Sequence, residues 1–341
     1  DITANGNGLH TNGNGSVITV NGGGVITVND SSTKGGYAAL RAGNGTINMN
    51  VALENGKATG GLGHDAVIKG NLAAVKAGDQ TASVINLALD TAKSSLEGVS
   101  YMTEGNGQIN LWLQNGASWT NEVHGSAEKD WKGNSLFSGS QVNSFAGGAT
   151  AAAAGNIYQK DSNALTIDNY SGNTNIFYEH AGDGVTFNAG DTVIKHAEKG
   201  SAVNLITSNK GLSINAETIN DTLSALAGKL TYTNYKDGER NLDGKVKIAG
   251  GLTSDSVTMA VGDILFNEAD GKGSGAQHIT VPSAPENQVS TSFNSTLTGD
   301  KDKDLEYVLG GVIKDGSYKF TEATSINVSG EGAKGMNFVK G

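Results

Sequence analysis

The chain has no cysteine and only two prolines among its 341 residues. The absence of cysteine excludes disulfides, thiolate metal ligands and a cysteine nucleophile. It also favours export, since an unfolded chain that crosses a periplasm and an outer membrane would be trapped by premature disulfides. Aromatic residues make up only 6% of the chain. A thick globular core is therefore not expected, whereas thin stacked layers of small aliphatic residues are.

Charge is also scarce, and the balance is acidic. Charged residues make up 17% of the chain, with 24 Lys and Arg against 34 Asp and Glu, for a net charge of −10. The basic residues are scattered, which argues against nucleic-acid partners and anionic membrane surfaces. No apolar run approaches the roughly 20 residues that span a bilayer, and Asp1 opens a polar segment rather than a signal peptide. We therefore expect a mature segment that does not insert into membranes and whose signal and anchor lie elsewhere.

Short runs that alternate β-branched and polar residues dominate what is present. Two of them, 17–22 (VITVNG) and 25–30 (VITVND), follow each other across glycines. A Gly-Asn-Gly unit starts a strand-like run at 43–50, and the same unit starts another at 105–112. The spacing between the two units predicts three coils of roughly 20 residues each. At about 4.8 Å per coil, the whole chain would form a rod of roughly 80 Å.

Two interpretations of the turns compete. Asn-Gly pairs such as Asn55-Gly56 and Asn115-Gly116 are hairpin signals, which would give an antiparallel sandwich or barrel. The same residues suit the tight corners of a parallel β-helix, which need positive φ. We favour the parallel β-helix, as a single elongated domain over residues 1–341, because the strands are short and numerous. Outward Asn and Thr residues would then stack into ladders on successive coils.

Two segments depart from this pattern. Apolar residues at Ile219, Leu223, Leu226 and Leu230 follow helical spacing, which predicts a short helical insertion or cap near residues 217–230. Both prolines follow a glycine-rich stretch, so residues 270–287 are expected to form an exposed loop or linker.

Three stretches carry a resemblance to a known family. They are 109–123 (INLWLQNGASWTNEV), 164–180 (ALTIDNYSGNTNIFYEH) and 231–252 (TYTNYKDGERNLDGKVKIAGGL). The first has an aliphatic strand, then Asn-Gly-Ala, then a Trp expected to be buried. In these three stretches the chain resembles the adhesin-like passenger domains of bacterial autotransporters (type V secretion). The resemblance implies a right-handed parallel β-helix at the bacterial cell surface or outside the cell, serving in adhesion, in self-association or as a structural stalk.

One motif matches a metal-binding pattern. Residues 60–68 (GGLGHDAVI) fit the nonapeptide repeat G-G-x-G-x-D-x-U-x, in which successive coils sandwich Ca²⁺. A single copy supplies only half of such a site, so an ordinary turn is expected here and no metal or cofactor is assigned. The six histidines form no His-x-x-x-His pair, and no G-x-S-x-G elbow is present. No catalytic residue is therefore assigned.

The enzyme alternative is a polysaccharide lyase or hydrolase on a β-helix scaffold. Such enzymes gather carboxylates in one exposed groove. The acidic residues that lie close together in sequence are Glu179, Asp183, Asp191 and Glu198. Each sits beside glycine or in a polar turn, and we therefore prefer a non-catalytic protein.

Aromatic residues concentrate in one stretch, comprising Tyr101, Trp112, Trp119, Trp131 and Phe137. Exposed rings stack on sugars, so this stretch is the candidate surface for a glycan or another partner. The alternative is that Trp112 and Trp119 fill the core or its corners. The expected partner is a host or bacterial surface protein or glycan, or a second copy of the chain.

Overall fold

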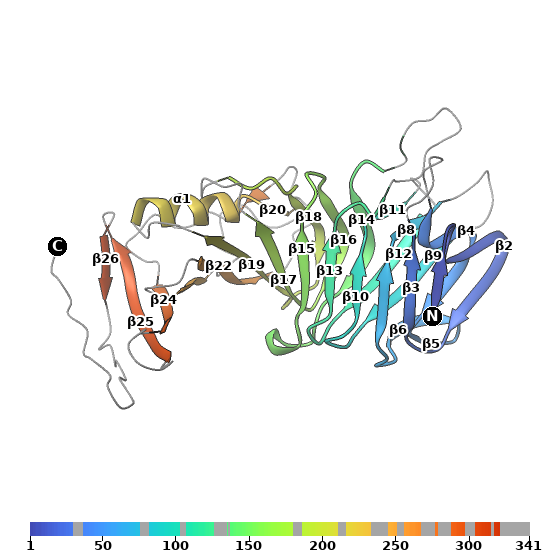
Figure 1. Cartoon of the computed structure of the whole chain (residues 1–341), viewed down its shortest axis with the longest axis horizontal. Coiled ribbons are helices and arrows are strands. Elements are labelled where there is room, and N and C mark those ends of the chain that lie inside the picture. The colour runs from blue at the N-terminus through green and yellow to red at the C-terminus, as the bar shows by residue number, and fades with distance from the viewer. Residues whose placement is uncertain are drawn as a thin grey trace.

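The computed structural model describes residues 1–29, 37–75, 82–102, 107–125, 135, 137–179, 186–210 and 216–232, and then shorter segments at 245–250, 256–266, 277–278, 288–296, 304–314 and 317–320. The described chain is mostly β-strand with one α-helix, so the expected all-β class is confirmed. Strands from residues far apart in sequence lie side by side and follow one another along the long axis of the molecule (Figure 1).

The larger sheet, sheet A, has 13 strands. In spatial order they are β1 (Ile2–Ala4), β3 (Gly24–Val28), β7 (Ala66–Lys69), β10 (Ser95–Glu97), β13 (Ser118–Asn121), β15 (Gly155–Gln159), β17 (Asn173–Glu179), β19 (Ala202–Lys210), β22 (Ser256–Leu265), β21 (Lys245–Gly250), β24 (Gln288–Thr296), β25 (Asp304–Lys314) and β26 (Ser317–Phe320). From β1 to β19 every pairing is parallel.

The second sheet, sheet B, has 11 strands. They are β2 (Leu9–Val20), β4 (Ala38–Met49), β8 (Asn71–Ala74), β9 (Ser83–Leu89), β11 (Ser100–Met102), β12 (Gly107–Leu113), β14 (Ser140–Ala146), β16 (Leu165–Ser171), β18 (Thr192–Ala197), β20 (Leu230–Tyr232) and β23 (Gln277–His278). All but the β20–β23 pairing are parallel. A short 3₁₀ turn, Ala151–Ala153, precedes β15.

The chain passes alternately through the two sheets as far as β20, and we call each passage through both sheets a layer. One inward residue of each sheet A strand lies in register with the corresponding residue of the next layer. This column runs through Ile2, Ile26, Ile68, Leu96, Trp119, Ile157, Ile176 and Leu205. All but the first are almost fully buried. The core therefore lies between the sheets as a thin continuous column.

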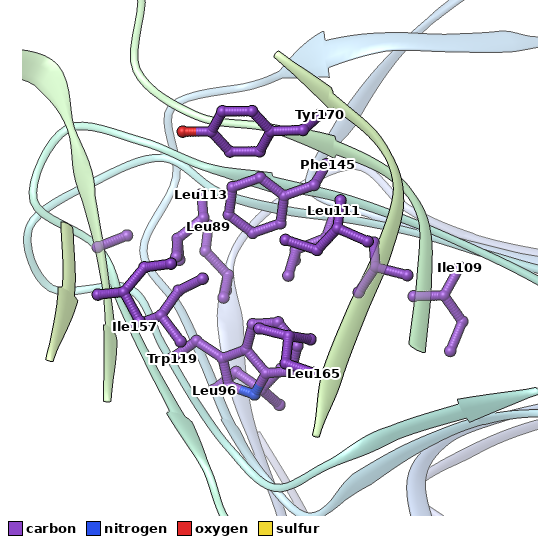
Figure 2. Close-up of a cluster of buried hydrophobic side chains, with 14 of the residues drawn as sticks. Leu89, Leu96, Ile109, Leu111, Leu113, Trp119, Phe145, Ile157, Leu165 and Tyr170 are labelled. Carbon is purple, nitrogen blue, oxygen red and sulfur yellow. The ribbon is translucent and has the colours of Figure 1, made fainter. Parts of the chain in front are cut away.

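Sheet B contributes the other wall of this core. Met49, Leu87, Leu111, Phe145 and Tyr170 occupy equivalent places in successive layers and are buried. Figure 2 shows Phe145 and Tyr170 one above the other, and their rings are stacked with centroids 5.7 Å apart. Phe145 therefore packs directly against the next layer, as expected for stacked short strands.

The layers are longer and less regular than the sequence repeat suggested. Thr46, Val84 and Gln108 are equivalent in three successive layers, so the separation of the two Gly-Asn-Gly units spans two layers rather than the predicted three. The layer from Ile26 to Ile68 is more than twice as long in sequence as the layer from Ile157 to Ile176. The parallel part of sheet A, up to β19, is therefore about 34 Å tall at about 4.8 Å per strand. The rod of roughly 80 Å was predicted for the whole chain, and this parallel part, which ends at Lys210, accounts for less than half of that length.

Both interpretations of Asn-Gly hold, each at one position. Asn55-Gly56 forms the tip of an antiparallel hairpin, β5 (Val51–Glu54) and β6 (Lys57–Gly61), which stands apart as a two-stranded sheet. Asn115-Gly116 instead turns the chain from β12 in sheet B to β13 in sheet A. The two asparagines have φ of 52° and 54°, and the two glycines have φ of 77° and 79°. The φ angles are nearly the same at the two positions, so the strands on either side decide which turn results.

The predicted helix is present as α1 (Ala216–Ala227), and its Leu223, Leu226 and Ala227 are buried. It ends before Leu230, which begins β20. Near the helix the parallel stack stops, because β22 pairs antiparallel with β19 and β23 pairs antiparallel with β20. The predicted loop at 270–287 lies outside the described residues except for the short strand β23.

Candidate binding face and buried polar column

The outer face of sheet A carries a regular pattern over its later strands. Ile157, Ile176 and Leu205 point into the core, and the residues on either side of each point outward and are half-buried. The outward residues form two rows that run across the strands β13, β15, β17 and β19. We call these rows together the flank face: Ser118, Thr120, Asn156, Tyr158, Asn175, Phe177, Asn204 and Ile206.

The first row of the flank face is built on amides. Asn175 donates from Nδ2 to Oδ1 of Asn156 across 3.0 Å, and Asn204 donates in the same way to Asn175 across 2.9 Å. Asn156 in turn donates to the carbonyl of Gly116. These bonds fix the amides in one direction along the stack, which confirms the predicted ladder of outward asparagines.

The second row is apolar at its later end. The Tyr158 and Phe177 rings stack with centroids 4.7 Å apart and an interplanar angle of 18°, and Ile206 occupies the next layer. Because the two rings cover each other's faces, this row presents ring edges and a flat apolar strip rather than an open ring face. Lys160 and Glu179 form an ion pair at the margin, and the eight residues of the flank face carry no charge. The arrangement suits contact with a flat, extended surface.

A second amide ladder runs across sheet B. Asn110 donates to Asn86 across 2.8 Å, Asn86 donates to Asn48 across 2.8 Å, and Asn48 donates to the hydroxyl of Thr19 across 3.2 Å. Asn48 and Asn86 are both buried. Since buried amides need partners, this ladder fixes the register of four layers.

A buried polar column connects layers at one side of the core. Ser140 donates to Asn121, and Asn121 donates to Gln159, each across 2.5 Å. Gln159 reaches the hydroxyl of Thr192, which lies 2.7 Å from the hydroxyl of Tyr178. All five side chains are buried. Burial raises the pKa of Tyr178 above its ordinary value, because ionising the phenol would place a charge out of contact with water.

The aromatic residues singled out from the sequence do not form one open platform. Trp119 is fully buried in the main core, as the core interpretation expected. Tyr101 is 2% exposed in a second small cluster, where Phe137 packs edge-on against it at 6.2 Å. Trp112 is half-buried on the outer side of β12, and Trp131 lies outside the described residues. The rings of Tyr101 and Trp119 are therefore closed to a sugar.

The calcium-like nonapeptide forms a corner tied to the next layer. Asp90 is buried there, and its carboxylate accepts hydrogen bonds from the backbone N–H of Gly63 (2.8 Å) and from Asn50 (2.9 Å). Asp65 accepts a hydrogen bond from Thr91 across 2.7 Å and lies 3.7 Å from Lys93. The two carboxylates thus have protein partners that explain their positions. Among the residues that the structure describes, no three His, Asp or Glu side chains gather as metal ligands.

The acidic candidates of the enzyme alternative belong to separate contacts. Glu179 pairs with Lys160 and Asp191 pairs with Lys229, while Glu198 is exposed. Asp183 lies outside the described residues.

One histidine joins several layers: His124 Nε2 lies 2.9 Å from the carbonyl oxygen of Val28, and Nδ1 lies 3.8 Å from Glu97.

The flank face was not predicted, although the sequence contains a signal for it. An Asn-aliphatic-apolar tripeptide occurs at 156–158 (NIY), 175–177 (NIF) and 204–206 (NLI). The two intervals between these copies differ in length, which hides the tripeptide from a search for a fixed period. Only the pairing of the strands shows that the three copies are neighbours.

No helix in the described part of the chain is long and apolar enough to cross a bilayer. No protein-family model, curated protein or solved structure matches the chain.

Proposed function

We propose that this chain is a right-handed parallel β-helix, the passenger of a bacterial autotransporter, exported across the outer membrane and displayed at the cell surface or released. Its role is adhesion through the flank face, without catalysis. The observation that carries this proposal is the flank face itself: amide and apolar rows, free of charge, repeated in register over successive layers. Individually weak contacts add up along such a surface, and no pocket is needed.

The partner expected from this chemistry is a surface protein or glycan of a host or bacterial cell, or a second copy of the chain presenting the same face. Stacked rings and Ile206 supply apolar contact, and the amide row supplies donors and acceptors beside it. An uncharged face also avoids the repulsion that an acidic protein, with its net charge of −10, would meet at other acidic surfaces.

The experiment is display of the chain on non-adherent bacterial cells, with cell settling and attachment to fixed epithelial cells as the measurements. Ile206→Lys places a charge in the flank face, and Val193→Lys is the matched control. Val193 is a half-buried β-branched residue on the outer side of β18 in sheet B. We expect the wild type and Val193→Lys to aggregate or attach, and Ile206→Lys to lose most of this activity at equal display. Equal activity of the two variants would refute a role for the flank face.

A further inference from the structure

The outer face of sheet B carries a half-buried indole on β12. Asn110 and Trp112 alternate with the buried Leu111 and therefore lie on this outer face. Trp112 is the register partner of Ala88 in β9 and of Ala146 in β14. Both neighbours carry a single methyl group, so no larger side chain in this row covers the indole. The stacked rings of the flank face, by contrast, cover each other.

Polar groups with unused hydrogen-bonding capacity lie beside this indole. Asn110 ends the sheet B ladder: its Nδ2 donates to Asn86, and no donor among the described residues reaches its Oδ1. An amide that donates a hydrogen bond is polarised, which makes its own oxygen a better acceptor. Ser144, the register partner of Asn110 in β14, is exposed, and no side chain in the described part of the chain bonds to its hydroxyl.

The spacing of these groups matches one sugar ring. Asn110 and Trp112 are two residues apart on one strand face, which separates them by about 6.6 Å along the strand. A pyranose ring has an apolar C–H face and hydroxyl groups around its rim. If the C–H face lies on the indole of Trp112, rim hydroxyls reach the amide of Asn110 and the hydroxyl of Ser144. C–H groups are attracted to the electron-rich face of an aromatic ring.

Charge selects a neutral sugar. Asn110, Trp112 and Ser144 are uncharged, and the whole chain carries a net charge of −10. On the neighbouring strand β16, the carboxylate of Asp168 is paired with Lys195 across 2.8 Å. An anionic sugar would therefore meet repulsion from the acidic chain and no cation within the site to offset it.

We propose that Trp112, Asn110 and Ser144 form a subsite for one ring of a neutral oligosaccharide. The preferred ring has the configuration of β-glucose, because its equatorial hydroxyls leave flat C–H faces for the indole. The site lies on sheet B and is separate from the flank face on sheet A. One stacked ring binds weakly, so the cell attachment expected of the flank face does not depend on this subsite.

The first test is isothermal titration calorimetry of the purified chain with cellohexaose, a neutral β-linked glucose oligomer. We expect Trp112→Ala to weaken binding about tenfold or more, because the stacking surface is lost. Trp112→Tyr keeps an aromatic face and should bind within about threefold of the wild type. Asn110→Ala removes one acceptor and should weaken binding about threefold.

Phe137→Ala is the matched control. Phe137 is another half-buried aromatic residue, but its ring packs against Tyr101 in the second small cluster. This variant should bind cellohexaose like the wild type, and circular dichroism establishes that all the variants are folded. A hexamer of galacturonate, which is anionic and of the same length, should bind at least tenfold more weakly than cellohexaose.

The second test locates the sugar by tryptophan fluorescence. Saturating cellohexaose should shift the emission of the wild type and of Trp119→Phe, and the shift should be absent in Trp112→Phe. The proposal is overturned if cellohexaose does not bind, if Trp112→Ala binds as well as the wild type, or if Phe137→Ala loses as much. Equal binding of the galacturonate hexamer would also overturn it. None of these outcomes bears on the flank face, which Ile206→Lys tests by cell attachment.

Discussion

The indole nitrogen of Trp119 donates a hydrogen bond to the backbone carbonyl of Gly98, in the preceding layer, across 2.8 Å. Trp119 is fully buried between Leu96 and Ile157 in the core column. Trp119→Phe would leave that carbonyl unpaired and a cavity beside it, and we expect the free energy of unfolding to fall by about 3 kcal/mol. Urea denaturation measures this. Trp112→Phe, on the outer side of β12, is the control and should cost far less; similar losses would contradict the core role of Trp119.

Gly98 itself permits no side chain. Its φ is +156°, and a Cβ there would lie 2.4 Å from the carbonyl oxygen of Gly70 in the layer below. We expect Gly98→Ala to destabilise the protein by about 3 kcal/mol, because both the backbone angle and the backbone contact must change. Gly60→Ala has open space around the new methyl group and serves as the comparison. The thermal unfolding curves of the two variants should therefore separate clearly. Coincident curves would argue against the close approach of the two layers at Gly98.

Asn86 occupies the middle of the sheet B ladder, donating to Asn48 and accepting from Asn110. Asn86→Ala leaves two ladder partners unsatisfied, so we expect a loss of about 2 kcal/mol. Asn110→Ala removes a single bond of the ladder at a half-buried position and should cost about 1 kcal/mol or less. Chemical denaturation of both variants gives the comparison. An Asn110→Ala cost equal to or above that of Asn86→Ala would show that the ladder does not act as a connected unit.

Burial raises the pKa values of Tyr170 and Tyr178 above the ordinary tyrosine value of 10.0. Both phenols therefore stay protonated in the folded protein at a pH where they ionise in the unfolded chain. Their contribution to stability is complete below about pH 10 and is lost as pH rises further. We expect Tm to fall from about pH 10 upwards in the wild type, and less steeply in the double variant Tyr170→Phe/Tyr178→Phe. Parallel pH profiles for the two proteins would contradict this assignment.

Much of the layer structure was predictable because its signals are local. Alternation around Ile109 and Leu111, and the helical spacing of Leu223 and Leu226, correctly placed β12 and α1. Trp119 was predicted in two ways, as a buried residue after an Asn-Gly corner and as part of a candidate glycan surface, and the structure supports the first. In each case, a few neighbouring residues determine both the element and its inward side.

The remaining features depend on which strands become neighbours, and that is not local. Asn55-Gly56 and Asn115-Gly116 are identical pairs with nearly the same φ angles, yet one closes a hairpin and the other turns a corner. The predicted number of residues per layer was wrong because excursions such as the β5–β6 hairpin add residues without adding a layer. For the same reason, the stacking of Tyr158 on Phe177 was missed.

The uneven layers have a consequence for protein engineering. The column of inward residues in sheet A and the amide ladders hold the strands in register. The number of residues from one layer to the next nevertheless more than doubles from the shortest layer to the longest. The tip of the β5–β6 hairpin, at Asn55-Gly56, is exposed and belongs to neither large sheet. A foreign peptide grafted there would lengthen one excursion and leave the stack unchanged, which makes the chain a scaffold for displaying epitopes at a defined height along its axis.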